Sequence, residues 1–272
     1  MARQRLDRVL VSRGLVSSRQ EASLAIEEHR VLVAGVVAEK PSRQVAPEDP
    51  IIVTDGGARF VSRGGLKLEH ALACFDLHVD GRLALDAGSS TGGFVDCLLQ
   101  RGASRVVAVD VGYGQLHEKL RSDERVLSLE RTNIRQLAAS ELRALLDGAL
   151  PTFLSADLSF ISLRPLVPVL LELVEKEADL VLLCKPQFEV GRIIASRGHG
   201  VVKDRSDRRS ALLGLCGALS ESRAAIMGVV SSPILGPAGN AEFCLHVRPT
   251  GASAPGLDDA IESALDQAEA LS

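Results

Sequence analysis

Two helical patterns and then three short apolar segments occupy the first part of the chain. Residues 6–10 place apolar side chains on one helical face and polar ones opposite. Gly14 is expected to end that helix, and Ser18 with Glu21 predicts a capping box at the start of the next. The strand-like segments that follow are residues 31–33, 36–37 and 51–53. This order predicts a small α+β unit.

From about residue 65 to residue 250, helical patterns alternate with short apolar runs. The runs typical of buried strands are residues 83–85, 106–109, 126–129, 153–156, 180–183, 225–230 and 243–247. Strands that alternate with helices predict right-handed crossovers and a largely parallel sheet. A Pro- and Gly-rich loop, residues 232–240, predicts that the last two strands form an antiparallel hairpin at one edge. Residues 256–271 predict a final helix.

A polar, Gly-rich segment at residues 54–58 predicts a domain boundary. We therefore expect a first domain at residues 1–58, a linker at residues 59–64 and a second domain at residues 65–272. The fold class is predicted as α/β: a Rossmann-like, doubly wound sheet preceded by a small N-terminal α+β domain.

Composition argues against disordered, membrane-spanning and disulfide-rich classes of protein. The chain has 272 residues, of which 46% are hydrophobic, and this predicts a packed core and not disorder. No apolar run approaches the roughly 20 residues of a membrane span, and the N-terminus is charged, unlike a signal peptide. We expect a cytoplasmic protein with no membrane partner. The five cysteines are scattered without a C-x-x-C pair, so neither a disulfide framework nor a bound metal is expected.

The net charge of −4 does not by itself indicate a nucleic-acid partner, but the first 20 residues are locally basic. They contain five arginines against Asp7 alone, and a basic module of this kind can dock on phosphates. The predicted RNA-contacting residues are Arg3, Arg5, Arg8, Arg13 and Arg19.

A Gly-rich loop, residues 86–94, follows the strand at residues 83–85 and opens a helix. Its G-x-x-x-G-G spacing differs from the G-x-G-x-x-G of dinucleotide-binding enzymes. Asp86 would repel a pyrophosphate but suits the cationic methionine moiety of S-adenosylmethionine. Asp110, at the end of the next strand, can accept hydrogen bonds from ribose hydroxyls. S-adenosylmethionine is therefore the favoured cofactor, and a nicotinamide cofactor is the alternative.

Four dispersed charged residues form a second candidate group: Lys67, Asp157, Lys185 and Glu242. Asp157, Lys185 and Glu242 lie at the ends of predicted strands, where open α/β sheets place their sites. Lys67 is predicted to lie just before the first helix of the second domain. Gly- and Pro-rich loops, residues 185–189 and 236–240, favour a functional role because such shaped loops rarely serve packing alone.

Nine stretches match one family, and the last four of them together are highly specific: residues 5–7, 18–19, 62–64, 86–94, 110–116, 130–133, 157–163, 185–189 and 239–240. On these stretches the chain resembles the TlyA family, whose members pair an S4-like RNA-binding domain with an FtsJ-type ribose methyltransferase domain. Some members of this family are also named haemolysins.

The resemblance implies S-adenosylmethionine as cofactor and 2'-O-methylation of cytidine in ribosomal RNA, with ribosomal RNA or ribosomal subunits as partners. It places the family's catalytic Lys-Asp-Lys-Glu tetrad on the four dispersed residues named above. The cofactor-binding residues that it implies are Asp86, Gly88, Ser90, Gly92, Gly93, Phe94, Asp110, Asn133 and Asp157.

The chain departs from the family pattern at two positions of the small domain. His29 stands where the family usually has glycine, and Ala34 stands where Asn or Asp usually precedes Gly35. Alanine is a poor turn former where a positive φ is needed. We expect the fold of the small domain to be kept and its local RNA contacts to differ from the family pattern.

The acceptor sets the mechanism that we expect. A ribose hydroxyl is weakly acidic, so a base must remove its proton as the oxygen attacks the methyl group. Lys185 is the predicted base and Lys67 its electrostatic neighbour, while Asp157 and Glu242 orient the lysines and the ribose. Tyr113 is a candidate to border the adenosine, and Phe188 is a candidate to support a flipped base.

Two other classes of function remain open at this point. A nicotinamide-dependent oxidoreductase is disfavoured by the glycine spacing and by Asp86. A non-catalytic RNA-binding adaptor would not need four charged residues at strand ends. A haemolysin-like lytic protein should show an apolar amphipathic helix or a span, and none is predicted.

Overall fold

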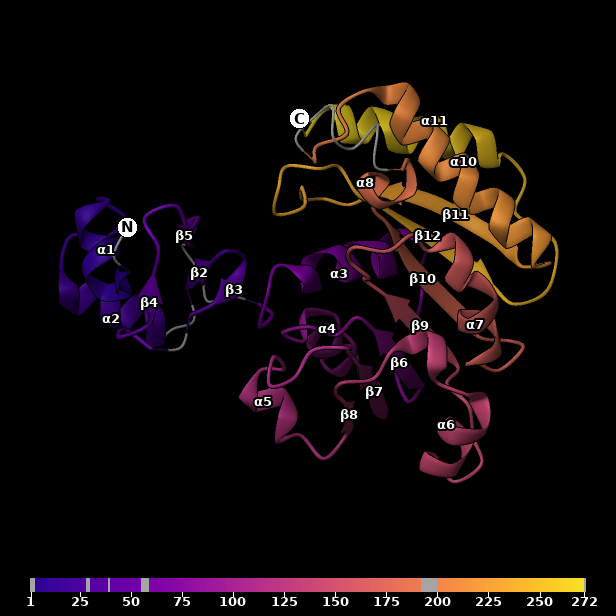
Figure 1. The fold of residues 1–272 in the computed structure, drawn as a ribbon, viewed down its shortest axis with the longest axis horizontal. Coiled ribbons are helices and arrows are strands. Elements are labelled where there is room, and N and C mark those ends of the chain that lie inside the picture. The colour runs from indigo at the N-terminus through magenta and orange to yellow at the C-terminus, as the bar shows by residue number, and fades with distance from the viewer. Residues whose placement is uncertain (1–2, 28–29, 39, 55–58, 192–199, 272) are drawn as a thin grey trace. The chain divides into compact units, whose positions relative to one another are not determined.

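The computed structural model describes residues 3–27, 30–38, 40–54, 59–191 and 200–271 of the chain. The chain divides into two compact units, Met1–Gly65 and Leu66–Ser272 (Figure 1). Residues 55–58 of the predicted boundary segment and the departure at His29 lie outside the described residues.

The first unit combines two helices with two small antiparallel sheets. Its helices are α1 (Leu6–Ser12) and α2 (Arg19–Glu27). Its strands are β1 (Gln4–Arg5), β2 (Val31–Val33), β3 (Val36–Val37), β4 (Gln44–Val45) and β5 (Ile51–Val53). The three predicted strands form one sheet in the order β3-β2-β5, and β1 pairs with β4. The two helices and three strands are confirmed, whereas β1 and β4 were not predicted, because two residues show no periodicity.

Two local predictions in this unit have different outcomes. Glu21 N–H donates to Ser18 Oγ at 3.1 Å, as a helix cap requires. The capping box itself is wrong, because the Glu21 carboxylate accepts from Ser17 N at 2.7 Å and not from Ser18. Ala34 has φ 52 and Gly35 φ 82 in the β2–β3 turn, so the alanine does occupy a left-handed conformation. Such a conformation costs a non-glycine residue roughly 1–2 kcal/mol.

Residues 59–64 pack on the first unit where they are described. Phe60 and Val61 are buried. Val37 N donates to Val61 O, and Arg63 N donates to Gly35 O. A Cβ added at Gly65 would overlap the Phe60 ring, so the backbone at this glycine packs directly on the aromatic side chain.

A seven-stranded sheet forms the centre of the second unit. Its strands are β6 (Leu83–Ala87), β7 (Arg105–Val109), β8 (Val126–Leu129), β9 (Phe153–Ala156), β10 (Asp179–Cys184), β11 (Ala225–Ser231) and β12 (Phe243–Arg248). The strand order is β11-β12-β10-β9-β6-β7-β8, and only β12 pairs antiparallel to its neighbours. The predicted doubly wound sheet and its antiparallel edge hairpin are confirmed.

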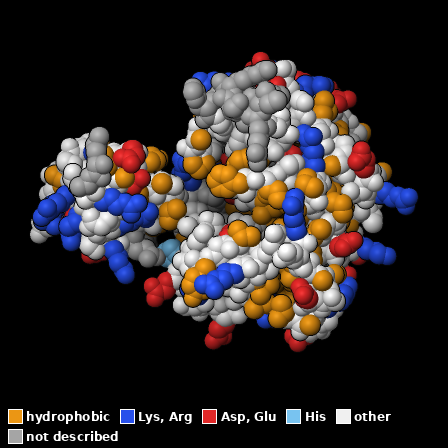
Figure 2. All heavy atoms as spheres, in the orientation of Figure 1, with side chains coloured by type: hydrophobic (Ala, Val, Ile, Leu, Met, Phe, Trp, Pro, Cys, Tyr) orange, Lys and Arg blue, Asp and Glu red, His pale blue; other side chains and the backbone are white. Residues whose placement is uncertain are grey.

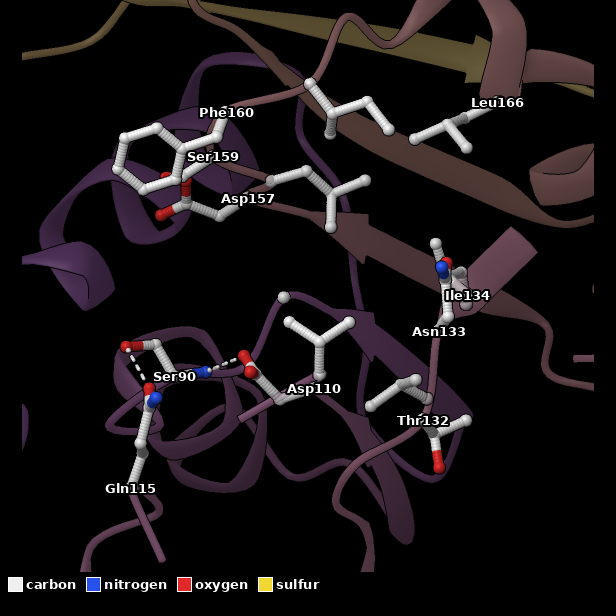
Figure 3. Close-up of a pocket in the computed structure, with 15 residues that line it drawn as sticks. Ser90, Asp110, Gln115, Thr132, Asn133, Ile134, Asp157, Ser159, Phe160 and Leu166 are labelled. Carbon is white, nitrogen blue, oxygen red and sulfur yellow. Dashed lines mark hydrogen bonds between the residues drawn. The ribbon is translucent and has the colours of Figure 1, made fainter. Parts of the chain in front are cut away.

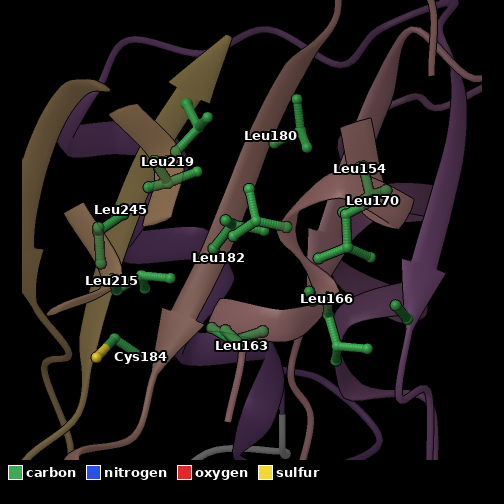
Figure 4. Close-up of a cluster of buried hydrophobic side chains, with 14 of the residues drawn as sticks. Leu154, Leu163, Leu166, Leu170, Leu180, Leu182, Cys184, Leu215, Leu219 and Leu245 are labelled. Atoms are coloured by element: carbon green, nitrogen blue, oxygen red, sulfur yellow. The ribbon is translucent and has the colours of Figure 1, made fainter. Parts of the chain in front are cut away.

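Helices cover both faces of this sheet. They are α3 (Gly64–Cys74), α4 (Gly93–Gln100), α5 (Glu118–Arg121), α6 (Ala139–Leu145), α7 (Val167–Glu172), α8 (Pro186–Glu189), α10 (Arg205–Glu221) and α11 (Leu257–Glu269), with short 3-10 turns at Ile134–Gln136 and Arg164–Leu166. On one face, leucines of β9, β10 and β12 pack against α7 and α10 (Figure 4). On the other face, α3 and α4 are joined by the ion pair between Glu69 and Arg101.

The strand order determines where a site can form. From β6 the chain crosses to β7 and β8, then returns to β9 on the other side of β6 and continues to β10. The loops after β6 and β9 therefore diverge and leave a crevice at the carboxyl edge. The start of β12 lies at the same edge because this strand runs in the opposite direction. None of the described helices combines the length and the hydropathy of a membrane-spanning segment.

Candidate active site

The Gly-rich loop after β6 approaches the loop after β9 very closely. Gly88 has φ 86, and a Cβ added there would lie 2.6 Å from the backbone oxygen of Asp157. Gly92, with φ 97, similarly has no room for a Cβ beside the side chains of Leu116 and Leu120. Glycine is therefore required at both positions, by conformation and by contact.

A cavity of about 420 Å³ opens between these loops (Figure 3). Its lining comes from the ends of β6, β7, β8 and β9: Gly88, Ser90, Val109, Asp110, Val111, Gln115, Thr132, Asn133, Ile134, Asp157, Leu158, Ser159, Phe160, Ile161 and Leu166. Five of the predicted cofactor-binding residues are in this lining: Gly88, Ser90, Asp110, Asn133 and Asp157. The other four are outside it: Asp86, Gly92, Gly93 and Phe94.

The Asp110 carboxylate is held rigidly in this cavity. Its Oδ2 accepts from Ser90 N at 2.7 Å (Figure 3). Its Oδ1 accepts from Gly112 N at 2.7 Å. A carboxylate oxygen has a further lone pair beyond the one used by each backbone N–H. Asp110 can therefore accept additional hydrogen bonds from hydroxyl groups in the cavity.

Asp86 lies behind the cavity, and its side chain is buried. Ser155 Oγ donates to Asp86 Oδ1 at 2.7 Å. Burial raises the pKa of Asp86 to about 7, and the nearby charges of Asp157 and Asp110 act in the same direction. Asp86 is therefore outside the cavity lining and joined to β9 through Ser155, and its predicted electrostatic role toward the cofactor stays a prediction.

The four dispersed charged residues form two ion pairs at the carboxyl edge of the sheet. Lys67 Nζ lies 2.5 Å from Glu242 Oε2, and Lys185 Nζ lies 2.5 Å from Asp157 Oδ1. Both lysines are buried, and Glu242 is only 1% exposed. The predicted place of Lys67 needs a correction, because α3 begins at Gly64 and contains it.

Lys67 is held as a cation. Burial lowers the pKa of its ammonium, but the carboxylates of Asp157 and Glu242 outweigh that effect and raise the pKa above its ordinary value. A charged Lys67 is suited to electrostatic stabilisation.

Three residues near the ion pairs were not predicted as site residues. Lys185 Nζ donates to Ser159 Oγ at 2.9 Å. The buried Glu189 accepts from Leu163 N at 2.7 Å and so ties α8 to the loop after β9. Phe160 is 92% exposed, and its ring centroid lies 5.5 Å from that of Phe188. All three occur in the motifs quoted above, but their contacts depend on tertiary structure, which no periodicity reveals.

Tyr113 lies outside the lining of the cavity. Its ring is 66% exposed and carries the Arg131 guanidinium 4.2 Å from its centroid. The structure therefore pairs this ring with a cation at the surface.

The five arginines of the first 20 residues differ in their contacts. The buried Asp7 pairs with Arg5 at 3.0 Å and with Arg19 at 2.6 Å, and these guanidinium groups hold the pKa of Asp7 well below its usual range. Arg13 donates to the backbone oxygens of Asp49 and Pro47. Arg3 and Arg8 are exposed and make no side-chain hydrogen bond to any other described residue. Lys and Arg side chains are prominent on the visible face of this unit (Figure 2).

Comparisons with known proteins agree with this architecture. The FtsJ-like methyltransferase family matches residues 60–248, and the S4 domain matches residues 4–51. The chain is 44% identical over 269 residues to the 16S/23S rRNA (cytidine-2'-O)-methyltransferase TlyA of Mycobacterium tuberculosis, covering 97% of this chain and 98% of that protein. It is 34% identical to the 23S rRNA (cytidine-2'-O)-methyltransferase TlyA of Campylobacter jejuni, covering 86% of this chain and 95% of that protein.

A solved structure extends the comparison to the whole fold. A Streptococcus thermophilus protein that bears a hemolysin name is 35% identical, with a TM-score of 0.78, covering 99% of this chain and 97% of that one. The predicted resemblance is confirmed by both sequence and fold. The chain belongs to the TlyA family, in which an S4 domain precedes an FtsJ-like methyltransferase domain.

Proposed function

We propose that this protein transfers a methyl group from S-adenosylmethionine to the 2'-hydroxyl of a cytidine in ribosomal RNA. Residues 1–58 would bind RNA, and residues 65–272 would carry out the transfer. Residues 59–64 would link these two domains. The observation that carries the proposal is the two ion pairs at the carboxyl edge of the sheet, Lys67 with Glu242 and Lys185 with Asp157, of which Asp157 also lines the cavity.

The cavity fits S-adenosylmethionine in size and in chemistry. Its volume of about 420 Å³ is within the usual range of small-molecule sites. Asp110 would accept hydrogen bonds from the ribose hydroxyls, and the backbone at Gly88 leaves room for close approach. Ile134, Leu158 and Leu166 provide apolar surface for the adenine.

The remaining predicted cofactor residues have distinct assignments. Ser90 and Asn133 line the cavity and would contact the cofactor there. Gly92, Gly93 and Phe94 would shape the loop and the start of α4 from behind. When bound, S-adenosylmethionine supplies a methyl group on a positively charged sulfur that leaves as a neutral thioether.

Lys185 is the proposed base. A lysine accepts a proton only as the neutral amine, and the ribose hydroxyl loses its proton to Lys185 Nζ as its oxygen gains the methyl group. Lys67, held charged by Asp157 and Glu242, would stabilise the negative charge that develops on the ribose oxygen. Asp157 would orient Lys185 and face the cofactor, because it both pairs with Lys185 and lines the cavity.

The RNA contacts are proposed from exposure and charge. Phe188, together with the exposed Phe160, offers an aromatic surface beside Lys185 on which a flipped base can stack. Arg3 and Arg8 are free to contact phosphates, and Arg5 and Arg19 present guanidinium groups fixed by Asp7. Arg13 would contribute mainly by holding the fold of the first unit.

Transfer of labelled methyl from S-adenosylmethionine to unmodified small and large ribosomal subunits tests this proposal. The wild type should label RNA at positions that then resist alkaline cleavage, since a 2'-O-methyl group blocks it. Lys185→Ala should abolish labelling, while Lys203→Ala, an exposed lysine without a role in the site, should not. Cofactor binding without transfer to either subunit or to free RNA would favour the RNA-binding adaptor instead.

A further inference from the structure

The amine of Lys185 has two partners, and both lie on the loop that follows β9. Its Nζ is 2.5 Å from Asp157 Oδ1 and 2.9 Å from Ser159 Oγ. An ionised carboxylate can only accept hydrogen bonds, and a serine hydroxyl can also accept one. The contact with Ser159 is a hydrogen bond, whereas the contact with Asp157 is an ion pair whose Oδ1 has no hydrogen-bond partner among the described residues.

A neutral lysine amine carries two N–H groups and one lone pair. If one N–H group points to Ser159 while the amine stays against the Asp157 carboxylate, the lone pair is confined to the remaining directions. Asp157 alone would leave the amine free to rotate about the terminal C–N bond, because one contact does not define an orientation. Ser159 supplies the second contact.

The surroundings hold Ser159 in a defined place. Ser162 Oγ donates to Glu189 Oε2 at 2.6 Å, so the buried Glu189 pins this loop. Phe160, the next residue along the chain, has φ 65, a conformation that a non-glycine residue adopts only when its context imposes it. Ser159 itself is exposed and lines the cavity, next to Asp157 on the wall that faces Ser90 and Asp110 (Figure 3).

We infer that Ser159 is a positioning residue for Lys185: its hydroxyl, with Asp157, fixes the amine so that the lone pair faces the ribose hydroxyl. This inference rests on the proposed function. In the step that it serves, the ribose O–H proton passes to Nζ, the oxygen–methyl bond forms and the sulfur–methyl bond breaks. One positive charge is lost at sulfur and one is gained at Lys185, so charge is conserved. The second ion pair of the site joins Lys67 and Glu242.

Single-turnover methyl transfer, with enzyme in excess over unmodified ribosomal subunits, measures this role. The variants are Ser159→Ala, Ser159→Cys and Ser159→Thr. Cysteine matches serine in shape but accepts hydrogen bonds weakly, and threonine keeps the hydroxyl. Because Ser159 is exposed, these variants should fold, and thermal unfolding checks this.

We expect the Ala and Cys variants to slow transfer by about 10- to 100-fold, the effect of a misplaced reacting group. Threonine should restore the rate to within roughly threefold, since the hydroxyl is present again. The dissociation constant of S-adenosylmethionine and the KM for the subunits should stay unchanged in all three, because the hydroxyl acts on Lys185 and not on binding.

Two results would overturn the inference. One is a wild-type rate in the Ala or Cys variant, and the other is an equal loss in all three variants, which would indicate a steric or binding role. Failure of the proposed function has a different signature: the wild type itself transfers no methyl group to RNA, or Lys185→Ala transfers it at the wild-type rate.

Discussion

Burial makes Asp86 a residue whose charge changes with pH near neutrality. Its side chain is 1% exposed, and its pKa is raised from 3.8 to about 7, first by burial and then by the charges of Asp157 and Asp110. The folded state therefore binds this proton more tightly than the unfolded chain does. The free energy of unfolding must fall as the pH rises between these two values.

We predict this loss for the cofactor-free protein, measured by urea unfolding at about pH 4.5 and at about pH 8. The contribution of Asp86 should be at most about 4 kcal/mol. Asp86→Asn removes the titration but keeps the shape and an acceptor for Ser155, so this variant should lose less stability over the same range. An identical loss in both proteins would show that other groups cause it.

Residue identity in the tetrad could be predicted from the sequence, but the pairing could not. The ends of strands mark Asp157, Lys185 and Glu242, and the parallel sheet brings such ends together. Nothing in the sequence distinguishes Glu242 from Asp157 as the partner of Lys67, and the actual partner is 175 positions away. The exposure of the Phe160 ring could not be predicted from the sequence either, because an apolar side chain is expected in the core.

Among the connecting elements, the loop before β12 contains Gly236, whose lack of a side chain leaves room for the Glu242 carboxylate. A Cβ added at Gly236 would lie 2.5 Å from Glu242 Oε1. The loop is also closed on itself, because Gly236 N donates to Asn240 O at 2.8 Å. Asn240 in turn accepts from Val202 N at 2.8 Å, so this loop also holds the chain that leads into α10.

Gly236→Ala should displace the Glu242 carboxylate and leave the buried ammonium of Lys67 without its partner. We expect a lower melting temperature and at least a tenfold slower methyl transfer, since breaking a buried pair costs about 3–5 kcal/mol. Gly217→Ala is the matched control: it lies in α10 with open space around it, and alanine is the better helix former by roughly 1 kcal/mol. A Gly236→Ala enzyme with wild-type stability and rate would contradict this role.

The strands of the second unit could be predicted within two residues, whereas the start of α3 could not. Their apolar runs are long enough to show a period, and each alternates with a helix. The capping box at Ser18 failed because Glu21 has two possible backbone donors, Ser17 and Ser18, that sequence spacing does not separate. The two-residue strands β1 and β4 depend on pairing with each other and carry no pattern of their own.

At the scale of the whole molecule, the first unit has a small excess of basic residues and the second an excess of acidic ones. The first 65 residues contain ten Lys and Arg against eight Asp and Glu, while the rest of the chain contains 21 against 27. The mildly acidic second unit gains little from general attraction to phosphates. Affinity for RNA should therefore depend strongly on the first unit, as the position of its arginines indicates.

The salt dependence of RNA binding by the full chain tests this division. Arg3→Ala and Arg8→Ala should each reduce the slope of log K against log salt by about one, because each removes a phosphate contact. Their melting temperatures should not change, since neither side chain bonds to another described residue. Arg13→Ala should instead lower the melting temperature, because its guanidinium holds the backbone oxygens of Asp49 and Pro47. Unchanged slopes for both Arg3→Ala and Arg8→Ala would place the main RNA contacts elsewhere.

The two partners of the Lys67–Glu242 ion pair are synthesised far apart in time, because they lie 175 positions apart in the sequence. Domains fold largely from the N-terminus while the chain is still being made. During translation the S4 unit, α3 and strands β6 to β10 emerge before Glu242 and β12 are added. A nascent chain can thus have a folded S4 unit while its methyl-transfer site still lacks β12 and Glu242. The site is complete only once β12 is inserted between β10 and β11.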